Sequence, residues 1–224
     1  MAGLQTIVNY SDSLTINRRR LVSVQYTRSE IAKVNETASR NPWRFSLGIS
    51  AALRYQDCRE LLEQLDYLDK TRPETISFNS STGASSGLAY MFAYQGALGQ
   101  GVLDQITVSS FSGNQLVLNV PAMATGTVIF KKGDYIQIKG FPYPFTSTTD
   151  VVKAAGSLLV TVTTHRPNFI SGSLGNPGIN VGNSVQFRML CINMPTPKLS
   201  PGGSNAIVSW GSGFELYEYT GDVL

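Results

Sequence analysis

Short runs that alternate apolar and polar residues constrain the fold of this chain more than any other feature. The clearest run is WRFSLGIS at residues 43–50, where every second residue is apolar. Such a period of two places one set of side chains on the core and the other set outside a β-sheet. The residues predicted to face the core are Trp43, Phe45, Leu47 and Ile49. The same period recurs in VQFRMLCIN, residues 185–193, and 21 glycines supply turns, so the sequence predicts a mainly β protein.

One segment has helical spacing instead. In YQDCRELLEQLDYLDK, residues 55–70, apolar residues recur every three or four positions. The predicted stripe consists of Cys58, Leu61, Leu62, Leu65 and Leu68. Pro73 prevents continuation of the helix, and residues 74–78, ETISF, predict a strand after it. We therefore expect one amphipathic helix packed on the core face of residues 43–50.

A second group of strands is predicted between about residues 102 and 170. Residues 127–140, TVIFKKGDYIQIKG, have the pattern of a hairpin that turns at Lys132 and Gly133. Ile136 and Ile138 are expected to face inward, and Tyr135, Gln137 and Lys139 outward. Residues 79–101 are rich in glycine and small residues, which favours a linker with an aromatic contact patch.

The closing segments AIVSW and FELYEYTG, residues 206–210 and 214–221, have no strand partner near them in the sequence. Pairing with the first sheet is the simplest solution. It predicts a discontinuous domain of residues 1–76 and 183–224, with residues 77–182 inserted as a small β-barrel or β-sandwich.

The residues that carry chemistry are sparse. His165 is the only histidine, and no nucleophile motif accompanies it, so a packing role is expected. Asp134 and Asp150 are expected to be ordinary turn residues. Phosphate-binding and dinucleotide-binding loops are absent, and one histidine gives no zinc spacing. We predict a protein without enzymatic activity, cofactor or metal.

Charge and cysteine usage exclude further classes. The net charge is +3 and the single basic run is RRR at residues 18–20, which does not require a nucleic-acid partner. Cys58 and Cys191 lie among apolar residues and are predicted to be buried thiols, with a disulfide left open. Neither a signal peptide nor an apolar run of membrane-spanning length is visible, so we expect synthesis in the cytoplasm without membrane insertion.

Two segments are candidates for contact surfaces. In FPYPF, residues 141–145, prolines hold the chain extended, which predicts that Phe141, Tyr143 and Phe145 project from a loop toward a protein or glycan. Residues 29–42, SEIAKVNETASRNP, are polar and mixed in charge, and are predicted to form a long loop. Loops of that length usually have a function.

Three parts of the chain resemble proteins of bacteriophage tails. Residues 41–78 resemble the opening of distal tail and minor tail proteins, with a Trp-led strand, an amphipathic helix and a strand. Residues 130–152 and 157–167 resemble a module of phage tail proteins in which a Gly-Asp turn begins a strand and a strand ending in Arg-Pro closes the module. Residues 185–197 and 206–221 are similar to the closing strands of distal tail and minor tail proteins. The residues that carry this last resemblance are Trp210, Gly213, Phe214, Leu216 and Glu218.

The resemblance implies a tail-tube-like β-sandwich with one flanking α-helix. It also implies a hexameric ring of this chain at the tail tip, which connects the tail tube to the baseplate or fibre hub. Its partners would be other tail or baseplate proteins, with DNA passing only as cargo, in a virion assembled in the host cytoplasm. The residues then expected to contact a neighbouring subunit are Arg28, Glu30, Lys33, Glu36 and Arg40.

Three other functions are weighed against this one. A tail-tube or tube-initiator protein would share the same architecture. A host-surface glycan-binding module of a tail would use the aromatic residues of the central segment. A cell-wall hydrolase would need acid–base residues that the sequence does not bring together.

Overall fold

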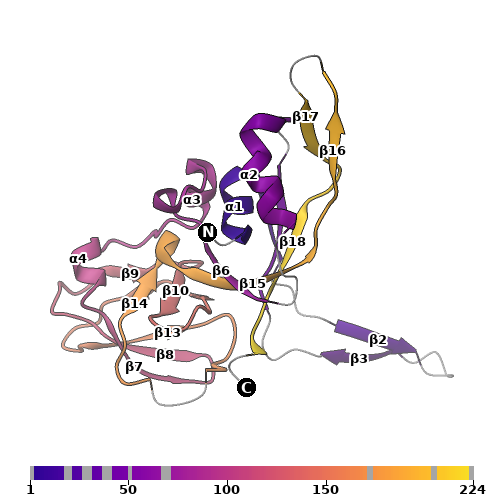
Figure 1. The fold of residues 1–224 in the computed structure, drawn as a ribbon. Helices are drawn as coiled ribbons and strands as arrows, with labels where there is room; N and C mark the ends of the chain where they lie inside the picture. The colour runs from indigo at the N-terminus through magenta and orange to yellow at the C-terminus, as the bar shows by residue number, and fades with distance from the viewer. Residues whose placement is uncertain are drawn as a thin grey trace.

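The computed structural model of this chain describes residues 3–17, 22–26, 32–36, 42–49, 52–66, 72–170, 174–202 and 206–221. For residues 22–26 and 32–36 it describes the backbone alone. The strands fall into two groups that lie next to each other (Figure 1). The first group has two helices on one side of a five-stranded sheet, and the second group consists of sheets of two or three strands. The predicted mainly β class is confirmed.

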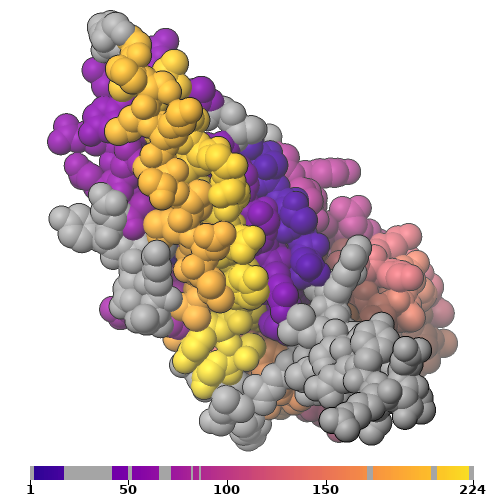
Figure 2. Space-filling view, turned by 90° about the vertical axis from the view of Figure 1, so that its right-hand side faces the viewer, coloured from indigo at the N-terminus to yellow at the C-terminus, as the bar shows by residue number. Residues whose placement is uncertain are grey.

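The first group is built on a five-stranded antiparallel sheet. Its strands, in spatial order, are β1 (Ser13–Asn17), β4 (Arg44–Gly48), β18 (Phe214–Glu218), β15 (Gln186–Asn193) and β6 (Glu74–Ser77). β18 pairs with β4 and β15, and β15 pairs with β6. Figure 2 shows the yellow C-terminal segment close to the indigo N-terminal segment on one face. The predicted pairing with the first sheet is confirmed for β18 and wrong for residues 206–210, whose strand Ile207–Trp210 belongs to a separate three-stranded sheet.

Two helices, α1 (Gly3–Tyr10) and α2 (Tyr55–Asp66), contribute to the core on one face of this sheet. The four residues predicted to face inward from residues 43–50 are all buried there. On α2, Cys58, Leu61 and Leu65 are buried and Leu62 is partly buried, as the stripe predicts. Leu68 lies outside the described residues. The expectation of a single helix is wrong, because α1 and two shorter helices are also present.

Truncating a leucine of α2 tests this core. Leu65→Ala should lower the free energy of unfolding by about 2–5 kcal/mol, because it removes buried methyl groups and leaves a cavity. Denaturant unfolding followed by circular dichroism measures the change. Glu63→Ala, on the exposed side of the same helix, serves as the control and should change stability by less than about 0.5 kcal/mol. Equal curves for Leu65→Ala and wild type would show that this face of α2 is not core.

Two smaller sheets accompany the first group. β5 (Leu53–Arg54), β16 (Pro197–Ser200) and β17 (Ile207–Trp210) form one, in the order β16-β17-β5. β2 (Val22–Tyr26) and β3 (Ala32–Glu36) form a two-stranded antiparallel sheet. The long polar loop predicted for residues 29–42 therefore contains a strand. The high content of polar and charged residues concealed this strand in the sequence. Its regular pairing with β2 becomes visible only in the structure.

The second group holds three small sheets. One has the order β13 (Leu159–Thr163), β8 (Gln115–Asn119) and β7 (Thr107–Ser112). Another has the order β11 (Phe145–Thr146), β10 (Tyr135–Ile138) and β14 (Ile179–Val181). The third pairs β12 (Val151–Val152) with β9 (Val128–Phe130). The assigned sheets of the described residues form no closed barrel.

The predicted hairpin at residues 127–140 is wrong. A tight turn does join β9 to β10, with Asp134 N–H donating to the Lys131 carbonyl at 3.0 Å and Gly133 at φ 96°. However, β9 pairs with β12, and β10 pairs with β11 and β14. Ile136 and Ile138 are buried and Lys139 is exposed, as predicted. Gln137 is buried instead of exposed, because its amide bonds the Phe141 carbonyl and the Gln186 N–H.

Residues 79–101 are more ordered than a linker. They contain a 3₁₀ turn (Ser80–Thr82), α3 (Ser86–Met91) and the start of α4 (Gln100–Leu103). Ala84, Leu88 and Phe92 belong to the first core, which draws on residues 4–92 and 185–216, whereas the second core draws on residues 103–181. A boundary at residue 77 therefore assigns part of the first core to the inserted unit. The division into two domains stays a prediction.

Candidate functional site: assembly surfaces

The β2–β3 hairpin is carried on the connection between two neighbouring strands. β1 and β4 are adjacent, and Asn17 lies opposite Arg44. A turn of two residues is enough to join antiparallel neighbours in such a register. The chain instead inserts a second hairpin, which extends away from both cores (Figure 1). It pairs with no other strand that the structure describes.

The register of this hairpin separates apolar from polar positions. Val24 lies opposite Val34 and Tyr26 opposite Ala32, whereas Gln25 lies opposite Lys33. Residues opposite each other share one face of a two-stranded sheet, so one face is mostly apolar in sequence. A two-stranded hairpin is at best marginally stable alone in water. A hairpin of this kind gains stability from a third strand or a covering surface, and no described strand other than its own two pairs with it.

The predicted subunit-contact residues fall in and around this hairpin. Arg28, Glu30 and Arg40 lie outside the described residues, as does the basic run at residues 18–20. Lys33 and Glu36 are on β3, opposite Gln25 and Val22, and only their backbone is described.

The outer strands of the large sheet differ in how their edges are covered. On β6, the Gln5 amide of α1 donates to the Ser77 carbonyl at 3.1 Å and accepts from the Ser77 N–H at 2.9 Å, as a neighbouring strand would. On β16 of the smaller sheet, Pro197 and Lys198 protect the edge. β1 is SLTIN, without proline or charge, and its outer edge pairs with no described strand. Of these three edges, β1 is the best suited to accept another strand.

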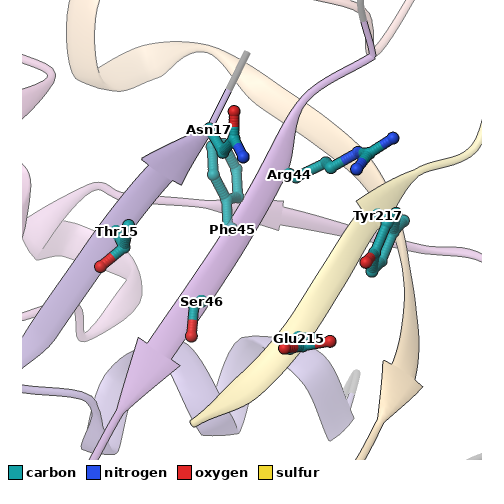
Figure 3. A pocket seen from close by; sticks show the side chains of 7 residues that line it. All are labelled: Thr15, Asn17, Arg44, Phe45, Ser46, Glu215 and Tyr217. Atoms are coloured by element: carbon teal, nitrogen blue, oxygen red, sulfur yellow. The ribbon is translucent and has the colours of Figure 1, made fainter. Parts of the chain in front are cut away.

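A polar pocket lies next to this edge. It is lined by Thr15, Asn17, Arg44, Phe45, Ser46, Glu215 and Tyr217, which come from β1, β4 and β18 (Figure 3). The register places Ser46 between Thr15 and Glu215, and Arg44 between Asn17 and Tyr217. The Arg44 guanidinium lies over the Tyr217 ring, 5.2 Å from its centroid. Sequence reasoning missed this pocket, since its residues come from segments about 170 positions apart.

The predicted aromatic surface at residues 141–145 is wrong for two of its three rings. Tyr143 and Phe145 are 2% and 0% exposed, and Phe141 is partly buried. Phe145 packs edge-on against Phe111 at 4.8 Å between ring centroids. The extended Pro-rich segment thus turns these rings into the second core instead of projecting them.

A buried ion pair joins the two groups of strands. Arg166 donates from Nη1 to Glu218 Oε2 at 2.5 Å and from Nη2 to Glu218 Oε1 at 2.8 Å, and both side chains are 0% exposed. Glu218 also accepts from the Trp43 N–H at 3.0 Å. The Pro144 carbonyl accepts from Arg166 Nη2 and from Trp43 Nε1, each at 2.9 Å. We call Trp43, Pro144, Arg166 and Glu218 the junction clasp.

The chain crosses between the two cores twice, after Phe92 and before Val185. The two crossings touch: a Cβ on Gly182 would lie 2.7 Å from the Tyr94 nitrogen. Gly182 also has φ 66°, so only glycine fits. The Tyr94 hydroxyl donates to the Ile129 carbonyl, and burial raises the pKa of Tyr94 to about 12.

The remaining chemistry-bearing residues have structural surroundings. His165 Nδ1 accepts from the Thr146 N–H at 3.0 Å, and its ring packs 5.0 Å from that of Trp43. Asp134 accepts from the Lys131 and Gln95 N–H groups at 2.7 and 2.9 Å, and burial raises the pKa of its carboxyl. Asp150 is exposed. Cys58 and Cys191 are both buried and free, which settles the open disulfide.

No protein-family model matches this chain, and no curated protein matches it. Within the described ranges, no group of three or more His, Cys, Asp or Glu side chains is placed to hold a metal ion. In the same part of the chain, each helix is too short or too polar to cross a membrane.

Proposed function

We propose that this chain is a structural protein of a phage tail tip or baseplate. Copies of it form a ring that extends the tail tube and connects it to the baseplate or fibre hub. This class is suggested by the resemblance of residues 41–78, 185–197 and 206–221 to distal and minor tail proteins, and of residues 130–152 and 157–167 to a module of phage tail proteins. The β2–β3 hairpin carries the proposal, because it is a protruding element that would gain stability from a surface of another molecule.

The ring follows from two unlike surfaces on one chain. The hairpin is one, and the uncovered edge of β1 is the other. Contacts between unlike surfaces are head-to-tail, and they close into a cyclic ring when the rotation permits. Strand addition and packing of the apolar hairpin face would supply most of the interface, since exposed ion pairs contribute only about 0–1 kcal/mol each.

Excising the hairpin tests the proposal. Replacement of residues 18–41 by a short Gly/Ser turn should leave the monomer folded, because Asn17 and Arg44 are already neighbours. Wild type should form rings in light scattering coupled to size exclusion and in electron micrographs. The excised variant should form no ring, and its circular dichroism spectrum should be unchanged.

A second shortened loop provides the matched control. Ser200 and Ile207 are also paired neighbours, so residues 201–206 are replaced by a similar turn. That variant should keep the ring. Wild type that stays monomeric at high concentration, or an excised variant that assembles as wild type does, would contradict the proposal.

A glycan-binding role has less support. It relied on Phe141, Tyr143 and Phe145, and the last two are buried. Among the large aromatic side chains, Tyr90 of α3 is exposed, at 74%. A tail-tube or tube-initiator role would use the same hairpin and edge. Assembly with a tape-measure partner would distinguish it from a tail-tip role.

A further inference from the structure

The polar pocket contains two opposite charges that pair neither with each other nor with another charged residue in the described part of the chain. Arg44 makes no hydrogen bond or ion pair with any residue that the structure describes, apart from its contact with the Tyr217 ring. Glu215 likewise makes none among those residues. Figure 3 shows their charged ends apart, on different sides of the pocket. Arg44 and Glu215 lie on adjacent strands and two positions apart in register, yet they do not satisfy each other.

The Arg44 guanidinium is held in an orientation in which it can bind a carboxylate from another molecule. Stacking on Tyr217 holds its plane, so less side-chain freedom is lost when its N–H groups bind an anion. In the same row across the sheet as Glu215, the pocket is lined by the short side chains of Ser46 and Thr15. Short residues let a second sheet approach to the usual spacing of about 10 Å between packed sheets.

We propose that this pocket is a two-fold contact between two copies of the chain, in which Arg44 of each copy binds the partner's Glu215. Arg44 and Glu215 lie on one surface, so a partner surface that pairs with both must place a negative charge opposite Arg44 and a positive charge opposite Glu215. The same pocket, turned about a two-fold axis, does so. This contact goes beyond the proposed ring, because the ring uses unlike surfaces and the hairpin, whereas this contact uses neither.

Charge reversal in separate variants gives a sharp test. Arg44→Glu leaves two acidic residues in the pocket, and Glu215→Arg leaves two basic residues. Each variant alone should self-associate at least about tenfold more weakly than wild type, because like charges then face each other. An equimolar mixture should form heterodimers, because both pairs are restored across the axis. Sedimentation velocity over a concentration series, with one variant fluorescently labelled, measures this.

Controls separate this contact from the ring. The double variant Arg44→Glu/Glu215→Arg should associate as wild type does, and Lys198→Glu, an exposed charge reversal on β16, should have no effect. The variant that lacks residues 18–41 should lose the ring and keep the two-fold contact. The proposal is overturned if Arg44→Glu associates as wild type does, if the mixture forms no heterodimer, or if the double variant stays dissociated.

Discussion

Arg166→Met should lower the free energy of unfolding by about 3–5 kcal/mol. The substitution removes both hydrogen bonds that reach the Glu218 carboxylate from the guanidinium, and that carboxylate is 0% exposed. A buried charge without its partner is costly, whereas the intact pair contributes much less than its Coulomb energy suggests. Denaturant unfolding at neutral pH measures the loss.

A double-mutant cycle isolates the pair. Arg166→Met combined with Glu218→Gln should cost less than the sum of the two single variants, by at least about 1 kcal/mol, because no buried charge remains. The matched control is Arg59→Met in the exposed pair Arg59–Glu63 of α2, which should cost about 0–0.5 kcal/mol. A loss below about 1 kcal/mol for Arg166→Met, or additive single variants, would contradict the role assigned to the junction clasp.

Phe187→Ala should cost a similar amount, about 3–5 kcal/mol. The Phe187 ring is fully buried at the centre of an aromatic cluster. Its neighbours, at 4.9–6.2 Å between ring centroids, are Trp43, Phe45, Phe78, Phe92 and Tyr135. Removal of the ring leaves a cavity that these rigid side chains cannot fill, so thermal and denaturant unfolding should both shift strongly.

Two variants on the same strand calibrate this result. Phe187→Leu keeps most of the apolar volume and should recover a large part of the loss. Ile192→Ala lies at the exposed end of β15 and should change stability by less than about 0.5 kcal/mol. If Phe187→Ala behaves as Ile192→Ala does, the aromatic cluster is not the centre of the first core.

The alternation of apolar and polar residues along a segment predicted which side chains face a core. It did not predict which strands pair with each other. Residues 43–50 and 185–193 alternate over enough positions for their inner faces to be read directly. At residues 131–134 the turn chemistry was also read correctly. The hairpin failed because β9 and β10 each find partners further along the chain, and no local signal encodes that choice.

Long-range polar contacts were the other limit. Arg166 and Glu218 are 52 residues apart, so nothing in the sequence marks them as a pair. Arginine and glutamate are usually exposed, so their residue types do not predict that they are buried. Tyr143 was expected on the surface because the Pro-rich segment extends the chain, whereas tertiary packing decided the direction of its ring. The length and polarity of residues 29–42 predict a functional loop, which stays a prediction, and the same polarity concealed the strand β3.

The two chain crossings at Tyr94 and Gly182 touch, so by themselves they would act as one hinge about which the second group of strands could swing. The junction clasp is a separate attachment that blocks this rotation. A rotational force on the second group would then be transmitted through the junction clasp to β4 and β18, because the clasp prevents rotation about the two crossings. Small-angle scattering of the Arg166→Met variant, under conditions where it stays folded, would reveal a released hinge as a wider distribution of shapes.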